Sequence, residues 1–267
     1  MIKYKPYFVN VNRGYGMSLK LRNLVLGSGR PSVCVPVTES APNDIIEHIK
    51  EITDDADMIE WRLDFFEKLS SQTQIKKTLT EAGEAAGDTP LIVTLRTKAE
   101  GGQFTGDLSE YDTLIMQCAA CRCADLIDVE YYSTTSPESF IQTLRSHGQK
   151  IIVSHHDFSK TPSEGEMTAI LEKMSATGAE IVKLAVMPES TEDVLSLLSV
   201  TDSFHRSHPD KLLVTMSMGS TGVISRVSGG VFGSCITFGS DRVASAPGQI
   251  EFHELKELLR IIEEAGN

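Results

Sequence analysis

The sequence lacks the features that would place the chain in a membrane or direct it out of the cell. Its 267 residues contain no uncharged apolar run of about 18 residues, the length that a membrane-spanning helix needs. The first residues, Met1 to Pro6, also lack the apolar core of about 7–15 residues that a secretory signal carries. We therefore predict a cytoplasmic protein with no membrane partner.

Cysteine is scarce and unevenly spaced. The five cysteines are odd in number and do not form a disulfide framework, so we expect reduced thiols at Cys34, Cys118, Cys121, Cys123 and Cys235. The spacing of Cys118, Cys121 and Cys123 is similar to that of metal ligands. No second cluster accompanies them, and we expect no metal there.

Runs of basic residues are absent too. The formal net charge is −12, which argues against a nucleic-acid-binding surface. We expect no nucleic-acid partner. An anionic small molecule would need arginines placed locally to receive it.

What the sequence does contain is a regular alternation of predicted strands and helices. It has eight strand-then-helix pairs, with no linker of changed composition between them. The pairs are 32–37 with 43–52, 57–64 with 72–86, 90–96 with 109–122, 125–130 with 137–147, 150–156 with 163–176, 180–186 with 191–204, 211–217 with a short helical piece at 222–227, and 234–238 with 251–263. This alternation predicts an α/β protein with a parallel sheet closed into a (β/α)8 TIM barrel.

Two segments precede the first pair. Residues 19–26 alternate polar and apolar side chains and predict an N-terminal β-hairpin that closes the bottom of the barrel. Residues 1–16 show no periodicity, and we expect a disordered or added extension there, which leaves 17–267 as a single barrel domain. An open doubly wound sheet is the structural alternative, but no Gly-x-Gly-x-x-Gly follows the first strand.

Several predicted strands carry charges on the face that would point into the barrel. Side chains alternate along a strand, so Glu60, Arg62 and Asp64 share one face. The same alternation predicts an inward direction for the side chains of Arg96, Asp128, Glu130, His156 and Lys183. Charges from five strands are costly to bury unless they pair or bind a ligand, and active sites of such barrels lie at the C-terminal ends of the strands. The charges therefore predict a site.

Lys183 lies in the middle of the apolar strand 180–186, beside Ile181 and Ala185. Full burial disfavours an ammonium and lowers the pKa of the amine by up to ~3–5 units. A neutral amine can form a Schiff base with a ketone or aldehyde. Two structural readings stay open: the side chain extends to solvent from the strand end, or it pairs with a buried carboxylate.

Other polar positions have structural readings as well. Glu60 and Arg62 could form an ion pair, and Asp128 and Glu130 could neutralise Lys183 or Arg96. His155 and His156 have opposite parity, which disfavours joint metal binding. The glycines that follow Glu100 could form an ordinary turn. The glycine-rich residues 229–233 could hold a phosphate between the last two strands.

Seven short motifs follow one another along the chain. They are Glu60-Trp61-Arg62-Leu63-Asp64, Arg96 with Glu100-Gly101-Gly102, His156-Asp157-Phe158, Lys183-Leu184-Ala185-Val186-Met187, Met216-Ser217-Met218-Gly219, Ser225-Arg226, and Ser245-Ala246-Pro247-Gly248-Gln249. In this order they resemble the type I 3-dehydroquinate dehydratases, the Schiff-base enzymes of the shikimate pathway. The resemblance extends from about Met17 to the C-terminus.

The resemblance implies three catalytic residues. Lys183 would attack the C3 ketone of 3-dehydroquinate and form an iminium, which acidifies the C2 proton. His156 would remove that proton and then help the C1 hydroxyl to leave as water. Glu100 would orient His156 and favour its charged form. The overall change would be a syn dehydration to 3-dehydroshikimate, with no metal or organic cofactor.

The resemblance also implies how the substrate is held. Arg226 would bind the substrate carboxylate, with Ser245 and Gln249 closing over it from the last loop. The ring hydroxyls of the substrate would be held by Glu60, Arg62 and Arg96. Met218 and Phe238 would form apolar walls near the imine. The family pattern further implies a homodimer that associates through barrel helices. His155 departs from the family pattern, and we expect it to lie away from the chemistry.

Two other functions compete with this one. A class I aldolase would share Lys183 but would not need Arg226, Ser245 and Gln249. A non-catalytic barrel could bind a shikimate-like ligand, but such a protein gains little from a buried nucleophilic amine.

Overall fold

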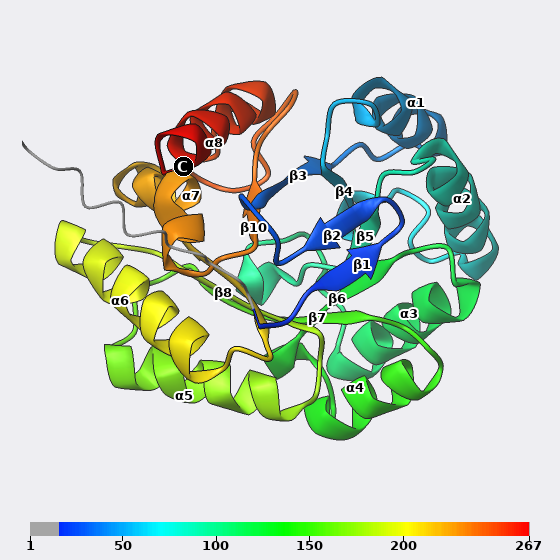
Figure 1. Ribbon diagram of the computed structural model, residues 1–267. Coiled ribbons are helices and arrows are strands. Elements are labelled where there is room, and N and C mark those ends of the chain that lie inside the picture. Colours follow the sequence, from blue (N-terminus) through cyan, green and yellow to red (C-terminus); the bar gives the residue numbers. More distant parts are fainter. Residues whose placement is uncertain (1–15, 267) are drawn as a thin grey trace, which may run out of the picture.

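The parallel strands of the chain close into a barrel in the computed structural model, which describes residues 16–266 (Figure 1). The strands are β3 (Ser32–Val37), β4 (Met58–Arg62), β5 (Leu91–Thr94), β6 (Leu126–Glu130), β7 (Ile151–Asp157), β8 (Ile181–Val186), β9 (Leu212–Ser217) and β10 (Ile236–Phe238). Their order in the sheet is β10-β3-β4-β5-β6-β7-β8-β9, so neighbours in sequence are neighbours in space.

The circle closes between the last two strands. Leu213 and Ser234 form a parallel bridge beside β10, and the N–H of Cys235 donates to the carbonyl of Leu213 at 2.8 Å. The predicted (β/α)8 barrel is therefore confirmed, and an open doubly wound sheet is excluded. The boundary at residue 16 stays a prediction, because residues 1–15 lie outside the described part of the chain.

Eight helices surround the strands. They are α1 (Pro42–Ile52), α2 (Gln72–Ala85), α3 (Leu108–Cys121), α4 (Pro137–Ser146), α5 (Glu164–Ala176), α6 (Thr191–Ser207), α7 (Gly219–Phe232) and α8 (Phe252–Gly266). Local sequence explains where several begin. Asp107, Ser163 and Ser190 each accept a hydrogen bond from the third residue of the helix that follows, in a reciprocal capping box. Within residues 16–266 we find no helix with the length and apolar character for a membrane crossing.

One helix differs from its prediction. We expected a short helical piece at 222–227, but α7 extends from Gly219 to Phe232. A Cβ on Gly222 would lie 2.3 Å from the carbonyl oxygen of Ser217, so this glycine is needed for close packing of the helix on β9. The proposed phosphate loop at 229–233 is wrong, because those residues form the end of α7. That end leads back to the start of β10, away from the C-terminal ends of the strands.

Strand parity divides the apolar side chains into two cores. Alternate residues such as Val35, Trp61 and Val182 pack against the helices. The inner core receives at least one apolar side chain from each strand, and its lowest layer consists of Cys34, Met58, Ile92, Leu126, Ile152, Ile181, Leu212 and Ile236. This layer seals the barrel interior below the charged side chains.

The predicted hairpin covers the bottom of the barrel. Strands β1 (Leu19–Leu21) and β2 (Leu24–Leu26) pair antiparallel and cross the barrel opening (Figure 1). Leu19, Leu21 and Leu26 join the inner core. The hairpin therefore shields the apolar layer from water at the end opposite the polar residues.

Candidate active site

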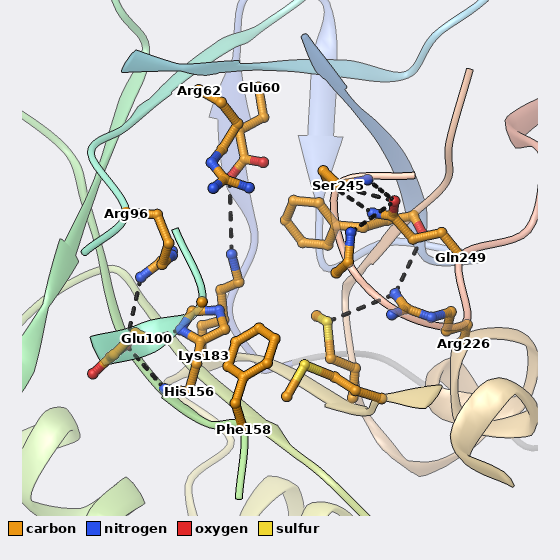
Figure 2. A pocket seen from close by; sticks show the side chains of 15 residues that line it. Glu60, Arg62, Arg96, Glu100, His156, Phe158, Lys183, Arg226, Ser245 and Gln249 are labelled. Atoms are coloured by element: carbon orange, nitrogen blue, oxygen red, sulfur yellow. Dashed lines mark hydrogen bonds and ion pairs between the residues drawn. The ribbon is translucent and has the colours of Figure 1, made fainter. Parts of the chain in front are cut away.

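A pocket lies at the C-terminal ends of the strands (Figure 2). All of the residues predicted as catalytic or substrate-binding line it: Glu60, Arg62, Arg96, Glu100, His156, Lys183, Met218, Arg226, Phe238, Ser245 and Gln249. The structure thus brings together residues from six strands or their following loops, from α7 and from the last loop.

Four further residues line the pocket that were not selected from the sequence. They are Gly101, Phe158, Met216 and Ala246. Each lies inside one of the seven motifs, so the signal was present. None carries an ionisable group, so a charge on the inward face of a strand could not single them out.

Lys183 is fixed in the middle of β8, between Ser154 of β7 and Val214 of β9 in register. It is 4% exposed, so it does not extend to solvent. Its Nζ lies 3.2 Å from Asp128 Oδ2, 3.9 Å from Glu60 Oε1 and 4.3 Å from the ring centroid of Phe238. The amine is therefore both paired with carboxylates and exposed to the pocket, a position that a purely structural ion pair does not require.

Arg96 and Asp128 form a second layer behind the lysine. Arg96 Nη2 lies 2.9 Å from Asp128 Oδ1, and Nη1 lies 2.9 Å from Glu130 Oε1. Burial raises the pKa of Asp128, but the cations of Arg96 and Lys183 outweigh it, and the net pKa is lowered. Asp128 therefore stays a carboxylate that holds both cations. The neutralising role considered for Asp128 and Glu130 is confirmed.

The alternative of an ion pair between Glu60 and Arg62 does not hold among the described residues. Arg62 instead makes a bidentate pair with Asp64, with Nε and Nη2 each donating at 2.8 Å. Glu60 accepts from the hydroxyl of Thr94 at 2.7 Å. Its carboxylate is left facing Lys183 and the pocket.

Glu100 binds two neighbouring histidines. Its Oε2 lies 3.0 Å from His156 Nδ1 and accepts from the backbone N–H of the same residue at 3.0 Å. Its Oε1 lies 2.9 Å from His155 Nδ1. The expectation that His155 lies away from the chemistry is therefore wrong, since it shares the carboxylate that orients His156.

The surroundings of His156 favour its neutral form. Its pKa lies well below the ordinary value, because the side chain is buried and because Arg96 and Lys183 repel a further positive charge. Burial also raises the pKa of Glu100. The protein without substrate therefore holds a neutral imidazole, in contrast to the charged form that we expected. The hydrogen bond to Glu100 assigns the remaining proton to Nδ1.

The glycines after Glu100 allow this arrangement. Gly101 has a φ of +84°, and a Cβ there would lie 2.2 Å from the ring of Phe158. A Cβ on Gly102 would lie 2.1 Å from the carbonyl oxygen of Arg96. The turn is therefore not an ordinary one, because it needs glycine twice to bring Glu100 over β7.

Arg226 differs from the other cations of the pocket. It is 1% exposed, and its guanidinium contacts only neutral acceptors, with Nη2 donating to the carbonyl of Pro247 at 3.0 Å. Among residues 16–266 no acidic side chain pairs with it. Burial lowers its pKa to about 10, so it remains a cation at neutral pH. A carboxylate is the group that such a guanidinium binds best.

The last loop lies beside Arg226 (Figure 2). Gln249 Oε1 accepts from the backbone N–H of Ser245 at 2.7 Å, and its Nε2 donates to the Ser245 hydroxyl at 3.1 Å. The carbonyl of Pro247 also accepts from the N–H of Gly219 at 3.1 Å. These bonds hold both polar side chains at the rim of the pocket.

Comparison with known proteins decides the family. The family model described as type I 3-dehydroquinase matches residues 33–265. The chain belongs to this family. It is a lyase with 3-dehydroquinate dehydratase activity, EC 4.2.1.10, of the shikimate pathway.

Similar proteins cover almost the whole chain. A 3-dehydroquinate dehydratase from Bacillus licheniformis is 41% identical over 246 residues, covering 91% of this chain and 97% of the relative. A type I 3-dehydroquinate dehydratase structure from Clostridium difficile, described with covalent modified comenic acid, is 38% identical, covers 93% of this chain and 99% of its own, and has a TM-score of 0.88. The Geobacillus kaustophilus structure is 32% identical, with a TM-score of 0.90 and coverage of 94% and 98%.

Two metal sites were considered for this family member. Within residues 16–266 no group of three or more His, Cys, Asp or Glu side chains has the arrangement of a metal site. Cys121 and Cys123 lie near each other at the end of α3, with 3.0 Å between their sulfurs, and Cys118 is buried. Neither the cysteines nor the paired histidines therefore form a metal-binding group.

Proposed function

We propose that this 3-dehydroquinase converts 3-dehydroquinate to 3-dehydroshikimate by a syn dehydration through a Schiff base on Lys183. One observation carries the proposal: a single pocket holds both the buried amine of Lys183 and the buried guanidinium of Arg226. Of these two groups, the guanidinium has no acidic partner among residues 16–266. The amine suits the ketone of the substrate, and Arg226 suits its carboxylate.

Lys183 acts as the nucleophile. The amine gives its proton to a neighbouring base and attacks C3, and the resulting carbinolamine loses water to give an iminium. The positive nitrogen then withdraws electrons from the C2–H bond, which lowers the barrier to proton removal. Asp128 fixes the direction of the side chain through its contact with Nζ. Met218 and Phe238 supply apolar walls around the imine.

His156 moves the protons. With one proton on Nδ1 bound to Glu100, its Nε2 presents a lone pair that takes the C2 proton. The electron pair of the C2–H bond then expels the C1 hydroxyl, which receives the proton from Nε2 and leaves as water. Hydrolysis of the product iminium restores Lys183. Glu100 acts here as a positioning residue.

The remaining residues hold the substrate. Arg226 binds the carboxylate, and Ser245 and Gln249 cover it from the last loop. Glu60, Arg62 and Arg96 bind the ring hydroxyls. This mechanism uses no metal or organic cofactor.

We also propose that the enzyme is a cytoplasmic homodimer. Exposed apolar side chains on the outer helices, Leu195 of α6, Ile224 of α7 and Ile261 of α8, offer surface for the association. Sedimentation equilibrium gives the mass directly. A single species at the monomer mass of 29.2 kDa at micromolar concentrations would contradict the dimer.

The imine can be trapped. We expect borohydride, added with 3-dehydroquinate, to fix an adduct that peptide mapping places on Lys183. The Lys183→Ala protein should show no adduct and no enone absorbance, whereas Lys211→Ala, which changes a lysine at the start of β9, should behave as wild type. Turnover without an adduct would reject the Schiff base, and ligand binding without turnover would favour the non-catalytic alternative.

A further inference from the structure

Five charged side chains outside the pocket join the last loop to α1. We call them the charge cluster: Glu39, His48, Glu51, Asp241 and Arg242. Glu39 lies between β3 and α1, His48 and Glu51 lie on α1, and Asp241 and Arg242 lie in the connection from β10 to α8. Figure 1 shows this connection in orange, extending beside the segment that enters α1. The same connection carries Ser245 and Gln249.

His48 is the buried centre of the charge cluster, with 2% of its surface exposed. Its Nδ1 lies 2.7 Å from Glu39 Oε1, and its Nε2 lies 2.9 Å from Asp241 Oδ2. A neutral imidazole has one N–H and one lone pair, so it can donate to only one of two carboxylates. Of the two contacts, the one between Nε2 and Asp241 has the geometry of a hydrogen bond, and it joins α1 to the β10–α8 connection.

The groups around Glu39 keep its carboxylate charged. Burial raises the pKa of Glu39, but the contacts with His48 and the charge of Arg242 outweigh it, and the net pKa is lowered. Arg242 Nη1 lies 3.2 Å from Glu39 Oε1, its Nε lies 4.0 Å from Asp241 Oδ2, and its Nη2 pairs with Glu51. Because Arg242 is largely in water, its pairs are weakened by solvent, and His48 is the stronger link.

The connection is held on two sides by different chemistry. Its base is closed by the N–H of Ser240, which donates to the carbonyl of Ile250 at 2.8 Å. On the α7 side the carbonyl of Pro247 accepts from Arg226 and from Gly219. On the α1 side the charge cluster supplies the contacts. The α1 side therefore depends on His48, the buried member of the charge cluster.

We propose that His48 is a positioning residue that holds the β10–α8 connection, and with it Ser245 and Gln249, over the pocket. This inference rests on the proposed role of those two residues in binding the substrate carboxylate. Only the closed connection places Asp241 against the buried ring, so the hydrogen bond between Asp241 and His48 Nε2 favours closure.

Kinetics test the functional part. We expect His48→Gln to raise KM about fivefold at about pH 6 and to change kcat less than twofold. His147→Gln, which removes an exposed histidine at the end of α4, is the matched control. Asp241→Asn should also raise KM and leave kcat nearly unchanged, because it alters the other partner of the same hydrogen bond. An unchanged KM in both variants would contradict the positioning role.

Hydrogen exchange tests the contact without turnover. At pH about 6, peptides covering 240–250 should exchange faster in His48→Gln and in Asp241→Asn than in wild type, and peptides of β4 to β6 should not change. Unchanged exchange at 240–250 in both variants would overturn the inference. An inactive wild type would reject the proposed function instead, and the exchange measurement would still decide the role of His48. If His48→Gln does not fold, Asp241→Asn changes a partly exposed side chain and gives the same readout.

Discussion

At the scale of single residues, the pocket sets the charge of each group through its neighbours. His156, Glu100 and Arg226 are all buried, yet only Arg226 has no oppositely charged neighbour among the described residues. The proposed roles follow this difference: His156, positioned by Glu100, would transfer protons, and Arg226 would bind an anion.

The lowered pKa of His156 predicts where activity is lost on the acid side. A pKa below the ordinary value of 6.5 means that the imidazole stays neutral, and able to accept a proton, at pH values below 6.5. We therefore expect the acid limb of kcat/KM that belongs to His156 to lie below about pH 6.5. Measuring kcat/KM against pH gives this limb. A limb well above that value would show that the substrate-free site favours the imidazolium after all.

Replacing Glu100 should lower kcat less than replacing Lys183. We expect Glu100→Gln to lower kcat by about 10²-fold, because the glutamine still fills the space but holds His156 less firmly. Lys183→Ala should abolish measurable turnover, since no other lysine among residues 16–266 lines the pocket. Equal losses in the two variants, measured by enone absorbance, would contradict a positioning role for Glu100.

Arg226 should not tolerate a lysine. Lysine keeps the charge but offers no planar fork of donors for a carboxylate, and it cannot reach both the substrate and the carbonyl of Pro247. We expect Arg226→Lys to raise KM by about tenfold or more, with a smaller change in kcat. Arg206→Lys, on the exposed face of α6, is the control. An unchanged KM would remove Arg226 from carboxylate binding.

At the scale of elements, the two ends of the barrel have separate tasks. The hairpin β1–β2 seals the bottom with Leu19, Leu21 and Leu26, and the polar residues lie at the other end. We expect Leu21→Ala to lower the free energy of unfolding by about 2–4 kcal/mol, because it leaves a cavity in the inner core. Activity below the unfolding temperature should be unchanged. Urea unfolding and kcat/KM check both parts, with exposed Val25→Ala as the control; a loss of kcat/KM would show that the two ends are coupled.

Sequence pattern predicted the elements and their parity better than their ends. The eight strand and helix pairs and the inward charges follow from periods of two and about 3.6 residues, which any buried element must obey. The length of α7 did not follow, because glycines 222, 229 and 230 lower its helix propensity. Tertiary packing determines the length of this helix. A Cβ on Gly230 would lie 2.3 Å from Pro31 Cγ, so the glycine serves close packing and not helix propensity.

At the scale of the whole molecule, pairings between distant segments were the hardest to predict. The alternation of side chains along the strand shows that Glu60, Arg62 and Asp64 point inward. It does not show that Arg62 forms its ion pair with Asp64 and not with Glu60. The contact of His48 with Asp241 joins residues 193 positions apart, and nothing local marks either one. The neutral state of His156 depends on the sum of burial and several charges, which exists only in the folded chain.

The closure of the barrel has a consequence for synthesis on the ribosome. Strand β10, three residues long, fills the gap between β9 and the first barrel strand β3, and it is made last. Until it emerges, the growing chain carries an unpaired β3 edge through most of translation, and such edges invite pairing with other chains. Ser245 and Gln249 follow β10 in the chain and are made later still. A nascent chain cut short before β10 should therefore be both a poor enzyme and a client for chaperones, and the two defects have one origin.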